Sequence, residues 1–288
     1  MRYKKWIKTL TLLIFGSVFL AFFAPFYPKK AVISSADNAK DKNNPYGWEK
    51  LSAYTTYFNQ NDVGRCENIA IAASLIDGVT IQPYGEFSFN ATVGKRTEEA
   101  GFQQAKIIMN GEYVLGVGGG VCQVSTTLYN AALKSGLTAT EFHPHTLQVS
   151  YVSPSRDAMV STQSDLKLFN PHAHAVYLSA KVFDGGVQIT FFGKNEGYRY
   201  EIISKTLEEI PPPPPIIKEG EKEEILRQEK SGIKSESYLE TYRGDTLLSR
   251  KRIRRDEYRA IQGIIVKKIL LPTRKMPSND CLLKGKML

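Results

Sequence analysis

The sequence predicts an α+β fold: a mixed domain in which a helix opened by a glycine-rich loop packs on an antiparallel sheet, followed by a small β-rich C-terminal module. Three observations carry this prediction. Apolar residues recur at helical spacing in residues 68–77, a glycine run opens a second helical pattern at 123–134, and short apolar runs separated by turns fill residues 146–192. Helices and strands are therefore both expected in one core.

The elements before the glycine run are short. The pattern in residues 68–77 places four apolar side chains on one helix face. Two short strands are expected at 79–81 and 87–89. Asn110-Gly111 is typical of a type I′ turn and predicts a hairpin around it.

The glycine run is the most unusual segment of the chain. Gly116 and Gly118–Gly120, followed by Val121 and Cys122, lead into a helical pattern at 123–134. Cys122 is expected near the first position of this helix, and Gly136 is expected to end it. Strands are expected after this helix at 146–152, 158–161, 166–169, 175–182 and 186–192.

The first 30 residues are typical of an export signal. Six basic residues and no acidic ones lie there, and the apolar run from Leu10 to Tyr27 carries no charge. At about 18 residues the run is near the lower limit for a membrane-spanning helix. It is either a cleaved signal peptide or a retained signal anchor, and both interpretations predict an extracytoplasmic protein, membrane-anchored or secreted to the cell surface.

Composition divides the chain into six segments. Pro211–Pro215 predicts an extended spacer between the main domain and a smaller β-rich piece. The expected segments are a signal at 1–30, a linker at 31–49, the main domain at 50–200, a Pro-rich linker at 201–229, a small β module at 230–270 and a basic tail at 271–288.

The formal net charge of +9 is unevenly placed. Residues 1–30 and 250–288 are strongly basic, whereas acidic residues outnumber basic ones in residues 31–249. This placement argues against a nucleic-acid partner for the main domain. It favours contact of the ends with a membrane surface or an anionic cell-wall polymer.

Several runs in the main domain resemble the VanW family of bacterial surface proteins. They are Phe87–Asn90, Val93–Thr97, Gly118–Asn130, His143–His145, Val149–Val152 and Arg156–Ala158. The resemblance covers residues 55–195 and departs from the family at Glu141-Phe142 and Ser153–Ser155. It implies a Gram-positive cell-envelope protein in the context of vancomycin resistance, and it supplies no mechanism. Residues 230–268 resemble, more weakly, a G5 module.

Cys122 is the strongest candidate for a reactive group. A thiol at a helix N-terminus is favoured as the thiolate, and its own N–H can contribute to an oxyanion hole. His145 follows as a candidate general base and Asp157 as the residue that orients it, which is the chain order of transglutaminase-like thiol enzymes. The expected substrate-binding residues are Gly119, Gly120, Gln123, Ser125, Thr126 and His143.

Each of these residues also has a simpler interpretation. Cys122 is also consistent with a buried core residue or with a disulfide to Cys66. The three cysteines of the chain leave at least one thiol free or paired with another molecule. Cys122 with His143 and His145 would make a metal-ligand set. Asp157 lies in a turn-rich segment where aspartates cap backbone N–H groups. His172 and His174 are expected on the solvated surface.

Two functions remain from the sequence. The first is a thiol amidase or acyltransferase, papain- or transglutaminase-like, that acts on peptidoglycan stem peptides or other cell-wall amides. The second is a non-catalytic cell-wall binding or scaffold protein. No cofactor and no metal are predicted, and the glycine run lacks the Gly-Lys-Ser/Thr ending of a phosphate-binding loop.

Overall fold

The computed structural model describes residues 44–109 and 111–268, which belong to one compact unit. No helix in these residues is long and apolar enough to cross a membrane. The predicted signal segment, the basic tail and Cys281 lie outside the described residues.

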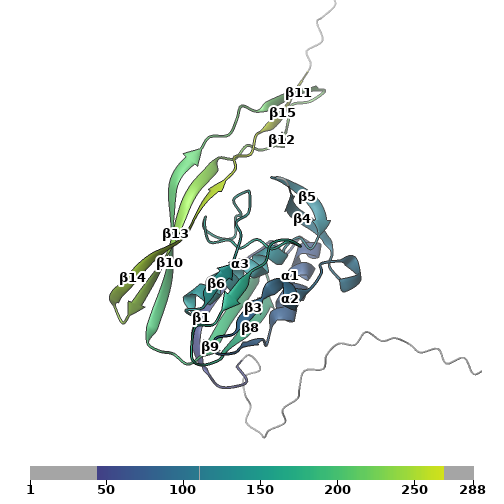
Figure 1. Cartoon of the computed structure of the whole chain (residues 1–288). Coiled ribbons are helices and arrows are strands. Elements are labelled where there is room, and N and C mark those ends of the chain that lie inside the picture. Colours follow the sequence, from purple (N-terminus) through teal and green to yellow (C-terminus); the bar gives the residue numbers. More distant parts are fainter. Residues whose placement is uncertain (1–43, 110, 269–288) are drawn as a thin grey trace, which may run out of the picture. The chain divides into compact units, whose positions relative to one another are not determined.

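The α+β prediction is wrong, because the described residues form a mostly β structure (Figure 1). Helical residues are confined to α1 (Val63–Ile76), α2 (Phe89–Val93), a 3-10 turn at Glu98–Ala100 and α3 (Val121–Lys134). The prediction underestimated the C-terminal third, where residues assigned to a linker and a small module form strands of 12 and 13 residues. Their polar, partly exposed side chains lack a strong apolar alternation, so the sequence pattern understates their length.

The core lies between α1, α3 and a four-stranded antiparallel sheet. The strand order is β1 (Glu49–Tyr57), β9 (Gly186–Gly193), β8 (Val176–Phe183) and β2 (Thr80–Ile81). Helix α3 packs on β1 and β9, and α1 packs on β8. Ile69, Leu128 and Phe191 are fully buried between these elements.

Two smaller β elements flank the core. A three-stranded sheet has the order β3 (Glu86–Ser88), β7 (Lys167–Phe169), β6 (Thr138–Glu141). The hairpin predicted around Asn110-Gly111 is confirmed as the antiparallel pair β4 (Gln104–Met109) and β5 (Glu112–Val117).

The segment between β6 and β7 is irregular, and the strand predicted at 146–152 is wrong. The strand predicted at 158–161 is reduced to a bridge between His143 and Met159. Side chains satisfy backbone groups here in place of a strand partner. Asn130 donates to the Arg156 carbonyl, and the Thr126 hydroxyl accepts from the Ala158 N–H.

The C-terminal part contains two further three-stranded sheets. The longer has the order β10 (Tyr198–Ile210), β13 (Gly232–Arg243), β14 (Thr246–Tyr258) and is antiparallel throughout. The other has the order β11 (Ile216–Gly220), β15 (Ile264–Lys268), β12 (Glu224–Arg227). Ile202, Leu239 and Ile253 of the longer sheet join the same hydrophobic cluster as the helices.

Candidate active site

A glycine turn sets the start of α3. Gly118 and Gly120 have φ values of +86° and +110°, a region that side-chain-bearing residues rarely adopt. A Cβ on Gly119 would lie 2.6 Å from the Lys106 carbonyl oxygen. The turn therefore requires glycine, and it places Cys122 at the second helical position, just beyond the N-cap Gly120.

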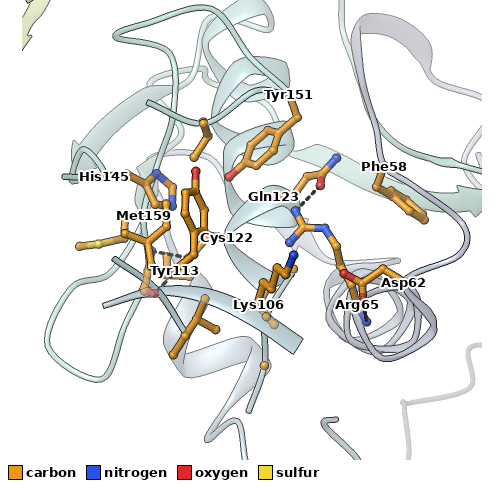
Figure 2. Close-up of a pocket in the computed structure, with 18 of the residues that line it drawn as sticks. Phe58, Asp62, Arg65, Lys106, Tyr113, Cys122, Gln123, His145, Tyr151 and Met159 are labelled. Atoms are coloured by element: carbon orange, nitrogen blue, oxygen red, sulfur yellow. Dashed lines mark hydrogen bonds between the residues drawn. The ribbon is translucent and has the colours of Figure 1, made fainter. Parts of the chain in front are cut away.

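The Cys122 thiol lies between a backbone segment and an imidazole (Figure 2). Its Sγ is 3.3 Å from the Val160 carbonyl oxygen and 3.5 Å from the Val160 nitrogen. Burial raises the pKa of the thiol, but the hydrogen bond and charge of His145, with smaller contributions from Val160 and Arg96, bring the pKa below its ordinary value. In the part of the chain that the structure describes, the Cys122 N–H has no hydrogen-bond acceptor.

His145 is fixed by a carboxylate on the side away from the thiol. Its side chain is 5% exposed, and Nδ1 lies 2.7 Å from Asp157 Oδ2. Burial lowers the pKa of His145, but the hydrogen bonds to Asp157 and Cys122 outweigh it and raise the pKa to about 9. Because Nδ1 is held by Asp157, Nε2 is the ring nitrogen available to the thiol.

Asp157 is almost fully buried and satisfied on both oxygens. Its Oδ2 also accepts from the His145 N–H at 2.7 Å, and its Oδ1 accepts from the Tyr258 hydroxyl. Burial raises the pKa of this carboxyl, but His145, Arg254 and Tyr258 together bring it below its ordinary value. The three residues that the sequence singled out for catalysis therefore lie next to one another: Asp157 is hydrogen-bonded to His145, and His145 is close enough to Cys122 to lower the pKa of its thiol.

Cys122 and His145 line a cavity of about 850 Å³. The glycine turn, the β4–β5 hairpin, the start of α1 and the loops at 149–151 and 159–162 enclose it. Its charged lining residues, apart from the Cys122–His145 pair, are Arg65, Arg96 and Lys106 against one acid, Asp62. The cavity therefore carries an excess of positive charge.

Gln123 anchors one of these cations. It is 1% exposed, and its Nε2 donates to the Thr56 hydroxyl at 3.1 Å and to the Tyr57 carbonyl at 2.9 Å. Its Oε1 accepts from Arg65 Nη2 at 2.7 Å. Among the described residues no carboxylate lies within 4.0 Å of the Arg65 side-chain nitrogens, so a fixed guanidinium faces the cavity without an ion-pair partner (Figure 2).

The remaining predicted site residues divide into two groups. Gly119 and Gly120 line the cavity with Gln123. Ser125 and Thr126 are fully buried and hydrogen-bond to Ala158. They hold the backbone next to Asp157 and do not line the cavity.

His143 lies apart from the cavity lining. Its Nε2 is 3.1 Å from Glu141 Oε1. His143, His145 and Cys122 do not form a metal-ligand cluster in the described part of the chain. Cys66 and Cys122 are both free cysteines.

Sequence reasoning missed several residues that line the cavity or support it. Arg96 and Tyr151 lie within runs that resemble the VanW family, which is a signal that could have identified them. Arg65 and Lys106 come from α1 and β4 and are brought to the cavity only by the fold. Arg254 and Tyr258 are about 100 residues beyond Asp157, and no local pattern connects them with it.

A second histidine group could hold a metal ion. His172 and His174, expected on the solvated surface, are partly buried, and their rings stack with centroids 5.0 Å apart. Nδ1 of each lies 3.7 Å from a Glu196 carboxylate oxygen, and His174 Nε2 is buried without a hydrogen-bond partner. Imidazole nitrogens and carboxylate oxygens are the donors that zinc accepts.

The fold and the site define a β-rich protein with a cysteine, histidine and aspartate joined at the N-terminus of a buried helix. Residues 64–192 match the family model described as VanW like protein, which confirms the resemblance over that part of the chain.

A curated relative extends this similarity. It is the uncharacterized protein YoaR of Bacillus subtilis (strain 168), which is 40% identical over 170 residues, or 59% of this chain and 54% of the relative. The chain therefore spans about half the length of that relative.

One solved structure, entitled Crystal structure of HP0197-G5, covers 24% of this chain and 96% of its own, at 16% identity and a TM-score of 0.15. A similarity at that TM-score assigns no fold, so the G5-like character of the C-terminal module stays a prediction.

Proposed function

We propose that this VanW-like protein is a thiol-dependent enzyme of the cell envelope that cleaves or transfers peptide amide bonds of the cell wall. One observation carries the proposal: Cys122, His145 and Asp157 lie next to one another at the wall of a large cavity, with His145 hydrogen-bonded to Asp157 and close enough to Cys122 to lower the pKa of its thiol. The lowered pKa of Cys122 and the raised pKa of His145 favour a thiolate beside an imidazolium, which is the resting state of an activated cysteine nucleophile.

In the proposed reaction, the Cys122 thiolate attacks the amide carbonyl carbon and forms a tetrahedral oxyanion. The unpaired N–H of Cys122 is a donor for that oxygen. The imidazolium of His145 gives its proton to the departing amine, the C–N bond breaks, and a thioester remains on Cys122. Water or a second amine then attacks the thioester, His145 takes the proton of the attacking group, and the thiolate is released.

The cavity also supports a class of substrate. Its three cations face one acid, and Arg65 has no ion-pair partner. A peptide that carries a free carboxylate near the scissile amide would complement this charge, and stem peptides of peptidoglycan are such peptides. The predicted export signal supports a site of action outside the cytoplasm.

The test is intact-mass analysis of the full-length chain after incubation with synthetic stem peptides, in a background in which Cys66 and Cys281 are alanine. We expect an adduct on Cys122 whose mass equals the acyl part of the peptide, together with release of the amine part. Cys122→Ala should abolish both, whereas restoring Cys66 should change neither.

The opposite outcome would contradict the proposal. If peptides bind with the same affinity to the wild-type chain and to Cys122→Ala, without adduct or cleavage, the enzyme proposal is wrong. The protein would then be a non-catalytic wall-binding protein.

A further inference from the structure

Two residues of strand β14, outside the matched residues 64–192, contact Asp157 directly. We propose that the C-terminal sheet β10–β13–β14 completes the active site, with Arg254 and Tyr258 as positioning residues that hold Asp157 and, through it, His145. The inference rests on the proposed role of Cys122, His145 and Asp157, and it adds that the VanW-like segment alone is an incomplete catalytic unit.

Tyr258 connects the sheet with the carboxylate. Its side chain is 1% exposed, and its hydroxyl donates to Asp157 Oδ1 and accepts from the Ser155 N–H at 2.7 Å. One hydroxyl therefore fixes both the carboxylate and the turn that precedes it. Burial and the Asp157 carboxylate raise the pKa of Tyr258, so this hydroxyl keeps its proton and remains a donor.

Arg254 brings a positive charge to the same place. Its Nη1 donates to the Asp157 carbonyl at 2.6 Å, and its Nη2 lies 3.6 Å from Asp157 Oδ1. Its Nε donates to Asp256 Oδ2 at 2.6 Å, which fixes the guanidinium from its own strand. The group also lies over the Phe142 ring, 5.4 Å from the centroid. A buried cation with these four contacts holds a defined position.

Further hydrogen bonds, besides those of Arg254 and Tyr258, attach the sheet to the irregular segment between β6 and β7. The Ser155 and Ser235 hydroxyl oxygens are 2.7 Å apart, and Ser204 Oγ donates to the Pro154 carbonyl at 2.6 Å. On the His145 side, the Arg259 N–H donates to the Thr146 carbonyl at 2.9 Å. The irregular segment that carries both His145 and Asp157 is thus fastened to β10, to β13 and to the end of β14.

The geometry explains why Asp157 needs this support. Its Oδ2 serves His145, so Oδ1 must be satisfied by another donor or remain buried and unpaired. Within the described residues, Oδ1 contacts only Tyr258 and Arg254. Without them the carboxylate could rotate, and the His145 ring would lose the orientation that presents its other nitrogen to Cys122.

The experiment measures the iodoacetamide alkylation rate of Cys122 against pH in the full-length chain, with Cys66 and Cys281 replaced by alanine. Tyr258→Phe removes only the hydroxyl, and Arg254→Gln removes the charge. Matched controls on the same sheet are Tyr242→Phe, whose hydroxyl donates to Glu240, and Arg252→Gln, whose guanidinium donates to Glu236.

We expect Tyr258→Phe to shift the ionisation limb upward by about one pH unit, so that the rate on the acid side of the limb falls about tenfold while the rate at high pH is unchanged. Arg254→Gln should shift it at least as far, and both controls should follow the wild-type profile. A site variant that lowers only the thermal unfolding temperature would show a purely structural role and overturn the proposal.

The outcomes separate this inference from the proposed function. An activated thiol in the wild-type chain, with an unchanged profile in Tyr258→Phe, overturns the positioning role alone. An unactivated thiol in the wild-type chain overturns the proposed function and this inference with it. If Arg254→Gln does not fold, Tyr258→Phe decides the question.

Discussion

Two helices of this protein carry a cysteine in their first turns, and the two thiols have opposite properties. Cys122 is the second residue of α3, with a free N–H and a pKa below its ordinary value. Cys66 is the fourth residue of α1, and its N–H donates to the Asp62 carbonyl at 2.9 Å. Burial and the Asp62 carboxylate raise the pKa of Cys66.

The difference teaches that a helix N-terminus alone does not activate a thiol. Both cysteines sit where the helix dipole favours a thiolate. Cys122 has His145 against its sulfur, whereas the Cys66 sulfur contacts the carbonyl oxygens of Asn59 and Gln60 at 3.6 and 3.5 Å and has an acid one turn away. The neighbouring groups, more than the helix end, therefore decide the reactivity.

The largest expected effect comes from removing one thiol at a time. At pH 6 an activated Cys122 should react with iodoacetamide on the order of 100-fold faster than a thiol of ordinary pKa, because the thiolate fraction changes tenfold per pH unit. Cys122→Ser should eliminate the fast phase, and Cys66→Ser should leave it intact. Equal alkylation rates for the two thiols, measured by mass spectrometry of labelled peptides, would remove the contrast between the helices.

The second effect tests whether His145 is the cause of the difference. In His145→Gln the imidazole is replaced by a neutral amide, so the Cys122 pKa should rise to the ordinary range or above it, since burial is then opposed only by the smaller contributions of Val160 and Arg96. The alkylation rate at pH 7 should fall about 30-fold, a thiol of ordinary pKa being only a few per cent ionised there. Measurement against pH checks this, with His143→Gln, outside the cavity lining, as the matched control. A drop of the same size in His143→Gln would assign the effect to the segment and not to His145.

Much of the Cys122 site could be predicted from the sequence. The glycine run predicted α3 and the place of Cys122, and the order of Cys122, His145 and Asp157 anticipated their meeting in space. Ser125 and Thr126 were expected to bind substrate because polar residues on a helix usually face solvent. They are buried because the irregular segment beside them has no strand partner and takes its hydrogen bonds from side chains.

The rest depended on contacts that local patterns do not encode. Tyr258 and Arg254 reach Asp157 because β14 returns along β13 after a turn, about 100 residues from the site. Arg65 faces the cavity because Gln123, itself fixed by β1, holds it there. The fold class was wrong for a related reason: strands with polar, partly exposed faces carry little apolar signal.

A smaller effect is expected from the charge of the cavity. Iodoacetate and iodoacetamide are nearly equal in size and differ in charge, so the ratio of their rates with Cys122 reports the local potential. Arg65→Gln should lower this ratio by about 3- to 10-fold, or about 1 kcal/mol, at low ionic strength, and by less in high salt. Lys181→Gln, an exposed lysine of β8 outside the cavity lining, is the control. A ratio that does not change in Arg65→Gln would remove the argument for an anionic substrate group.

The smallest expected effect concerns Cys66 of α1. It tests whether the reactivity of this thiol can be raised toward that of Cys122 in α3. Asp62→Asn removes the carboxylate that raises the pKa of Cys66 but keeps a side-chain oxygen that can accept from the Arg65 N–H as the helix cap. With Cys122 and Cys281 replaced by alanine, alkylation of Cys66 at neutral pH should become about twofold faster, since a partly exposed charge contributes only a fraction of a pKa unit.

Glu67→Gln, which removes a weaker contribution of the same sign, should give a smaller increase. If Asp62→Asn instead brought Cys66 to the reactivity of Cys122, the absence of an acid would be sufficient for activation and the histidine unnecessary. An increase confined to about twofold leaves His145 as the group that separates the two thiols.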